Sequence, residues 1–138
     1  MNRTAKTLAA IAFLALPLGG CVVVPDSPNV EGRPWAQGTP VPLGQPVLVG
    51  DVAVTAKRIV EDSRCPINAR CVWAGRLIVE TRIDGAGWRD TANITLGESY
   101  GTHGQVVALV DAGPDKMTSP ELQSGQYRFT FADAKDPG

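Results

Sequence analysis

Residues 76–96 read RLIVETRIDGAGWRDTANITL, and they carry the strongest secondary-structure signal in the chain. Apolar and polar side chains alternate over residues 77–83 and again over residues 88–96. A period of two is typical of a β-strand that buries one of its faces. Residues 84–87 between the two runs are Asp-Gly-Ala-Gly, and glycine tolerates the positive φ angles of a tight hairpin turn. The stretch therefore predicts two antiparallel strands joined by a short turn.

Further short strands are predicted on both sides of this hairpin. They are rich in β-branched or aromatic side chains, are bounded by turn residues, and lie at residues 47–49, 52–60, 106–110 and 126–131. After residue 20, the helix candidate is a single turn at residues 119–122, with Ser119 as N-cap and Pro120 at the first helical position. This succession of short strands predicts an all-β fold, a single small antiparallel β-sandwich or barrel.

The composition excludes several classes of protein. The 138 residues allow one domain, and 13 basic against 14 acidic side chains give a net charge of −1, which argues against a nucleic-acid-binding protein. The chain contains one histidine, His103, in a glycine-rich segment that we expect to be a solvated loop. A single imidazole excludes most histidine-based metal sites and catalytic triads. We therefore expect no metal, no cofactor and no nucleic-acid partner.

The N-terminus has the features of a targeting segment. Arg3 and Lys6 precede an apolar run, residues 7–18. That run is shorter than the roughly 18–20 residues that a helix needs to cross a bilayer. We therefore expect residues 1–20 to be a signal peptide and not a membrane-spanning helix.

The predicted signal ends in Leu-Gly-Gly followed by Cys21, which resembles the lipobox of bacterial lipoproteins. The resemblance implies that Cys21 becomes the first residue of the mature protein and carries a lipid, with acyl chains such as palmitate. Two or more acyl chains anchor a protein stably to a membrane. Val22 stands at the next position, where an Asp would act as a sorting signal, and this implies the outer membrane, facing the periplasm, if the host is diderm. An ordinary secretory signal with an incidental cysteine is the alternative.

Residues 21–43 are expected to form a lipidated, extended tether. This part of the chain is rich in proline and glycine and has no helix or strand period, so it favours polyproline-like conformations. Trp35 is expected to cap the edge of the folded core, with contact to the membrane interface as the alternative. The β-sandwich domain is predicted over residues 44–133, followed by a flexible tail at 134–138.

Cys65 and Cys71 remain once Cys21 carries the lipid. Two cysteines in an exported domain usually pair, so we predict a structural disulfide. A redox-active pair is less favoured because the spacing is C-x5-C and not C-x2-C. A zinc site is less favoured because tetrahedral sites need four ligands and His103 is the only imidazole.

The residues around the two cysteines form a recognisable motif. Residues 62–75 read DSRCPINARCVWAG. The pattern D-S-R-C-P-x4-C-V-W-A-G resembles a motif in a group of uncharacterised secreted and lipoprotein domains of bacteria, and the resemblance covers roughly residues 43–132. It identifies a family of small β-domains and implies no established activity.

In a structural interpretation of the motif, every distinctive residue stabilises the loop. Asp62 and Ser63 cap loop amides, and Arg64 pairs with a carboxylate. Trp73 stacks over the disulfide in the core, and Gly75 relieves crowding at the entry to the next strand. We favour this interpretation for Asp62, Trp73 and the two cysteines.

In a functional interpretation, the rigid loop presents side chains to a partner, because a preorganised loop loses little entropy on binding. The candidate binding residues are Arg64, Asn68, Arg70 and Trp73. For Asn68 and Arg70 the sequence favours neither interpretation.

Together these features predict a non-catalytic cell-envelope lipoprotein, attached to the membrane by its N-terminal lipid, whose disulfide-closed β-domain binds a protein or peptide. No combination of residues in the sequence suggests a nucleophile with its base. One alternative is a loop over residues 64–71 that resembles those of trypsin-like protease inhibitors, which requires an extended, exposed Arg64. The other alternative is an envelope enzyme of unknown type.

Overall fold

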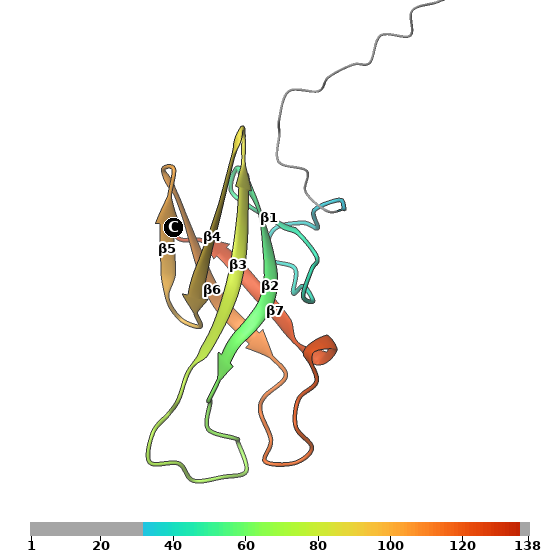
Figure 1. Cartoon of the computed structure of the whole chain (residues 1–138), viewed down its shortest axis with the longest axis vertical. Coiled ribbons are helices and arrows are strands. Elements are labelled where there is room, and N and C mark those ends of the chain that lie inside the picture. The colour runs from blue at the N-terminus through green and yellow to red at the C-terminus, as the bar shows by residue number, and fades with distance from the viewer. Residues whose placement is uncertain (1–31, 136–138) are drawn as a thin grey trace, which may run out of the picture.

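The computed structural model describes residues 32–135, so the predicted signal peptide and Cys21 lie outside the described part of the chain. Figure 1 shows an all-β domain. Its elements are β1 (Val47–Val49), β2 (Val52–Asp62), β3 (Leu77–Gly85), β4 (Trp88–Thr95), β5 (Ser99–Thr102), β6 (Gln105–Gly113), the 3-10 turn η1 (Ser124–Gln126) and β7 (Arg128–Asp133). Strands β1 to β4 form one antiparallel sheet in chain order, and β5 to β7 form a second. The predicted β-sandwich is confirmed.

The core lies between the two sheets. In β3 the alternating residues Leu77, Val79 and Ile83 are fully buried, as the period of two predicts. From the opposite sheet, Phe129 and Phe131 of β7 meet them in one hydrophobic cluster. Full burial of each such side chain contributes about 1.5–3 kcal/mol. The fold is therefore held by the inner faces of strands whose pattern the sequence shows.

Two secondary-structure predictions are corrected. The helical turn predicted at residues 119–122 is absent, and a 3-10 turn forms at η1 instead. Gln126 Oε1 accepts a hydrogen bond from the backbone N–H of Gln123 at 2.7 Å and caps this turn. Residues 119–121 are exposed, so a helix there has no apolar face to bury. The hydrogen bonds of a single turn do not offset the unfavourable free energy of helix nucleation. Strand β5 was not predicted, because its sequence Ser-Tyr-Gly-Thr has no run of apolar residues.

The described part of the predicted tether also departs from expectation. Val41 is fully buried and pairs with Phe129 of β7 through two backbone hydrogen bonds, at 2.9 and 2.8 Å. The backbone of Trp35 forms a parallel bridge with Val47 of β1, but its side chain is 44% exposed and is not part of the core cluster, so the predicted capping of the core edge by this side chain is not seen. Residues 33–43 therefore belong to the folded domain. The sequence did not predict this, because the segment is rich in proline and glycine and its strand-like contacts are isolated ones, at Trp35 and Val41. Isolated contacts leave no periodic pattern in the sequence.

The two ends of the sandwich carry different features. Figure 1 shows the segment between β2 and β3 together with the segment between β6 and β7 at the lower end. The turns between β1 and β2, β3 and β4, and β5 and β6 lie in the upper part of the same view. Over residues 32–135, no helix is long and apolar enough to span a membrane.

Candidate functional site

The disulfide loop, residues 63–76, joins β2 to β3. Cys65 and Cys71 form the predicted disulfide, with their Cα atoms 5.8 Å apart. At the neck of the loop, the backbone N–H of Ser63 donates to the carbonyl of Arg76 at 2.8 Å, and the Ser63 hydroxyl accepts from the Arg76 N–H at 3.0 Å. The predicted capping role of Ser63 is therefore confirmed.

An ion pair fixes the base of the loop. Arg64 Nε and Nη2 donate to the two carboxylate oxygens of Asp62 at 2.8 and 3.0 Å, and Arg64 Nη1 donates to the carbonyl of Ala112 at 3.2 Å. The Tyr127 hydroxyl donates to Asp62 Oδ2 at 2.6 Å. The side chains of Asp62 and Arg64 are only 8% and 16% exposed. Such two-point pairs are rigid, so this network ties the loop to β6 and β7.

The electrostatics keep this ion pair charged at neutral pH. Burial by itself raises the pKa of Asp62, but hydrogen bonds from Arg64 and Tyr127 and the Arg64 charge outweigh it, and the pKa lies below its usual range. The hydrogen bonds to Asp62 raise the pKa of Arg64 against the opposing effect of burial. Burial and the bond to Asp62 raise the pKa of Tyr127 to about 12. Arg64 is thus the predicted partner of a carboxylate, and its guanidinium is occupied within the domain.

A second loop braces the first. Asn68 Nδ2 donates to Thr118 Oγ1 at 2.9 Å, and the Thr118 N–H donates back to Asn68 Oδ1 at 3.0 Å. The N–H of Ile67 donates to the carbonyl of Lys116 at 2.9 Å, and Lys116 Nζ donates to the carbonyl of Asp62 at 2.7 Å. Asn68 therefore holds the disulfide loop against residues 116–118, while Arg70 is exposed beside it.

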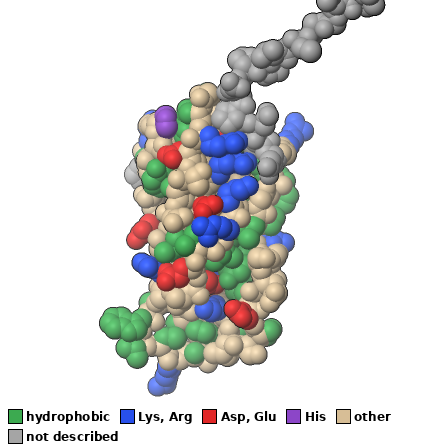
Figure 2. Space-filling view, in the orientation of Figure 1, with side chains coloured by type: hydrophobic (Ala, Val, Ile, Leu, Met, Phe, Trp, Pro, Cys, Tyr) green, Lys and Arg blue, Asp and Glu red, His purple; other side chains and the backbone are tan. Residues whose placement is uncertain are grey.

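Trp73 does not lie over the disulfide in the core, so that part of the structural interpretation is wrong. Its side chain is 81% exposed, Val72 is 91% exposed and Ile67 is 66% exposed. We call Val72 and Trp73, which are neighbours in the chain, the apolar tip. They lie beyond the ends of the strands, where no second sheet covers them. Figure 2 shows hydrophobic side chains projecting from this end of the molecule.

Gly75 turns the chain back from the apolar tip toward β3. Its φ is +68°, and a Cβ at this position would lie 1.7 Å from the carbonyl oxygen of Ser63. Only glycine fits such a close approach of two backbones in a left-handed conformation. The predicted relief of crowding by Gly75 is confirmed.

The disulfide loop is basic. Residues 63–76 contain Arg64, Arg70 and Arg76 and no Asp or Glu. Arg76 pairs with Glu61 of β2, and its side chain stays 62% exposed. The surface around the apolar tip therefore combines large apolar side chains with exposed guanidinium groups.

The structure reveals a further candidate site that sequence reasoning missed. A hollow of about 240 Å³ lies at the opposite end of the sandwich and includes Trp88, His103 and Gln105 in its lining. His103 is exposed in the turn between β5 and β6, as predicted, and its ring also stacks on Trp88 with ring centroids 4.0 Å apart. No spacing in the sequence signals this hollow, because its walls come from three separate turns and from the segment beyond β7. Within residues 32–135, no group of three His, Cys, Asp or Glu side chains is arranged to hold a metal ion.

Comparison with known proteins identifies no relative. No family model matched the chain, and no match was found among curated proteins or solved structures. The resemblance of residues 62–75 to the bacterial motif therefore stays a prediction.

Proposed function

We propose that this chain is a lipid-anchored, non-catalytic protein of the cell envelope whose apolar tip binds a protein partner. The anchor is Cys21, through the lipobox-like sequence that precedes it, and in a diderm host the domain is held at the outer membrane, facing the periplasm. The observation that carries the proposal is the exposure of Trp73 and Val72 on a loop that is otherwise tightly fixed.

Exposed large apolar side chains gain free energy when a partner removes them from water, at roughly 25 cal/mol per Å². A loop that is already rigid loses little conformational entropy in the process. The disulfide, the Asp62–Arg64 pair and the Asn68–Thr118 bonds each reduce that loss here. Tryptophan and arginine are also the residues most enriched among those that dominate binding energy at interfaces.

The charge of the loop indicates what the partner offers. Three arginines and no carboxylate within residues 63–76 favour an apolar cleft edged by Asp or Glu side chains. Arg70 is the exposed arginine best placed to meet such a rim, since Arg64 is held by Asp62 and Arg76 by Glu61. We assign Trp73 and Val72 the anchoring role and Arg70 the steering role.

A protease-inhibitor loop centred on Arg64 is not favoured. Such a loop presents an extended, exposed arginine to the protease. The Arg64 side chain is 16% exposed and donates to Asp62 and to the carbonyl of Ala112. Its release would break an ion pair at the base of the loop.

The test is site-specific photo-crosslinking in living cells. A photoreactive residue replaces Val72, which leaves Trp73 in place, and the matched control carries the same residue at the exposed Asn93 of β4. We expect one discrete protein adduct from position 72, none from position 93, and loss of the adduct when Trp73→Ala is added. The partner so identified should bind purified Trp73→Ala about 30-fold more weakly, the effect of losing about 2 kcal/mol at a hot spot.

Two outcomes contradict the proposal. Adducts formed only with lipid would show that the apolar tip docks on a membrane. Absence of any adduct at position 72 in correctly anchored protein would show that the loop has only a structural role and binds no partner.

A further inference from the structure

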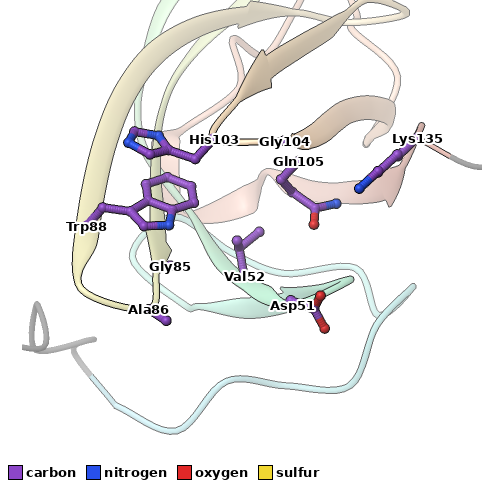
Figure 3. Close-up of a pocket in the computed structure, with 9 residues that line it drawn as sticks. All are labelled: Asp51, Val52, Gly85, Ala86, Trp88, His103, Gly104, Gln105 and Lys135. Carbon is purple, nitrogen blue, oxygen red and sulfur yellow. The ribbon is translucent and has the colours of Figure 1, made fainter.

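The hollow at the upper end of the sandwich, which we call the turn pocket, is formed by parts that are distant in sequence. Its lining includes Asp51 and Val52 from the first hairpin, Trp88 at the start of β4, and Gln105 at the start of β6. Lys135, just beyond β7, lines the opposite side. Figure 3 shows these side chains surrounding an open space. At about 240 Å³ it is smaller than the 300–1,000 Å³ typical of sites for drug-sized ligands, so it suits a group of amino-acid size.

One wall of the turn pocket is an aromatic stack. The rings of Trp88 and His103 are nearly parallel, with an interplanar angle of 10°. A Cβ on Gly85 would lie 2.1 Å from Trp88 Cε2, so the indole lies between the His103 ring and the bare Cα of Gly85. Both indole faces are therefore covered, and stacking of a ligand on Trp88 is excluded. Ring edges carry partial positive charge, which favours an anionic group beside them.

Gln105 supplies an unused hydrogen-bond donor. The residue is only 8% exposed, and its Nε2 is buried without a hydrogen-bond partner. A buried amide without a partner is destabilising, so a ligand that accepts a hydrogen bond from it binds more tightly for that reason. Gly50 packs against both this amide and the Asp133 carboxylate, since a Cβ there would lie 2.7 Å from Asp133 Oδ2 and 2.9 Å from Gln105 Nε2. Figure 3 shows the Gln105 amide group directed toward the open space beside Lys135.

Two opposite charges flank the same space. In Figure 3 the amine of Lys135 extends toward the amide of Gln105, and Asp51 lies apart from both on the first turn. Neither Lys135 nor Asp51 has an ion-pair partner among residues 32–135. The backbone N–H of Lys135 donates to Asp133 Oδ1 at 2.9 Å, which holds the chain beside the pocket.

We propose that the turn pocket binds a zwitterionic group of amino-acid size, with its carboxylate between Lys135 and Gln105 and its ammonium toward Asp51. A simple anion would leave Asp51 unmatched, and a simple cation would leave Lys135 and Gln105 unmatched. A zwitterion matches both charges and the buried amide at once. This site is independent of the apolar tip, which lies at the other end of the domain.

The experiment is a titration of the ¹⁵N-labelled mature chain, followed by NMR at the Trp88 indole N–H and the Gln105 side-chain amide. The probe is L-alanine, compared with acetate, methylammonium and glucose, which carry only the anion, only the cation and neither. We expect saturable shifts with alanine and binding at least about tenfold weaker for the other three, because each lacks at least one charged contact.

Variants assign the contacts. Lys135→Gln and Asp51→Asn replace exposed side chains and should each weaken alanine binding about tenfold, while the matched control Arg70→Gln at the far end should leave it unchanged. Equal binding of acetate and alanine would reduce the site to an anion site, and preferred binding of glucose would make it a polyol site. Either result, or the absence of saturable shifts, overturns the proposal.

Discussion

Tyr127 shows how one side chain couples the disulfide loop to the rest of the domain. It lies in the core beside Phe129, with ring centroids 5.9 Å apart, and its hydroxyl reaches back to Asp62. Its pKa of about 12 exceeds the ordinary value of 10.0, so the folded protein holds this proton more tightly than the unfolded chain does. The resulting stability is complete below pH 10 and is lost as the pH rises toward 12.

This predicts an alkaline weakening that depends on Tyr127. From about pH 9 to about pH 11, the free energy of unfolding of the wild type should fall by about 1 kcal/mol more than that of Tyr127→Phe. Urea unfolding of the two proteins at several pH values measures the difference. Other groups that titrate in this range are common to both proteins. Equal slopes for the two proteins would mean that the Asp62 bond does not hold the tyrosine proton.

Gly75 and Gly87 form a matched pair of glycines at positive φ, +68° and +76°. A Cβ on Gly75 would clash with Ser63, whereas a Cβ on Gly87 meets nothing within 4 Å. Gly87→Ala should therefore cost only the left-handed conformation, about 1–2 kcal/mol. Gly75→Ala should cost at least about 2 kcal/mol more, because the two strands at the loop neck must separate. Denaturant unfolding of both variants checks this, and equal losses would contradict the close packing of the neck.

At the scale of elements, the disulfide loop is stabilised by several independent contacts, so loss of the disulfide should weaken the domain without unfolding it. Closing this short ring contributes about 2 kcal/mol on the loop-entropy model. The double variant Cys65→Ala, Cys71→Ala should fold and melt about 10 °C lower in a domain of this size. Chemical reduction of the wild type should give the same shift in a thermal melt. An unchanged Tm would show that the ring adds no stability.

Strand β4 and strand β5 show a second contact at this scale. Asp90 of β4 accepts hydrogen bonds from the Tyr100 hydroxyl at 2.9 Å and the Thr102 hydroxyl at 2.7 Å, both in β5. These bonds lower the pKa of Asp90 and raise that of Tyr100. The carboxylate also accepts from the backbone N–H of Thr91 at 2.8 Å. Asp90 therefore links the two sheets through its side chain. Its carboxylate also occupies the Thr91 N–H of the edge strand β4, so this N–H is not available to pair with the strand of another molecule.

At the scale of the whole molecule, the predicted anchor and the domain are separable. Mass spectrometry of the protein from its native membrane should show Cys21 as an acylated N-terminal residue. The variant Cys21→Ser should lose the lipid, but its domain should keep the Tm of the wild type. The reason is that the core cluster is formed by residues between Val41 and Phe131, far from Cys21 in the sequence. An unmodified Cys21 thiol in mature protein would contradict the lipoprotein assignment.

The sequence by itself determined the all-β class, most strand positions and the cysteine pair. The alternation over residues 77–83 and 88–96 indicates which side chains share a face of a strand. This pattern depends only on neighbouring residues, so it can be seen without the tertiary structure. The structural interpretation of the motif predicted that Arg64 pairs with a carboxylate, but the sequence did not identify Asp62, two residues earlier, as its partner. Residues 33–43 were misassigned because isolated contacts such as that of Val41 leave no periodic trace.

Only the tertiary structure decided the exposure of Trp73 and the existence of the turn pocket. The motif fixes the position of Trp73 in the sequence, two residues after Cys71, but not whether its side chain is buried. Burial requires another part of the fold to cover the side chain, and nothing covers Trp73, which is 81% exposed. The turn pocket likewise joins Asp51 between β1 and β2, Gln105 at the start of β6 and Lys135 beyond β7. Such arrangements follow from how two twisted sheets pack at their ends, which is set by the sum of long-range contacts and not by any local pattern.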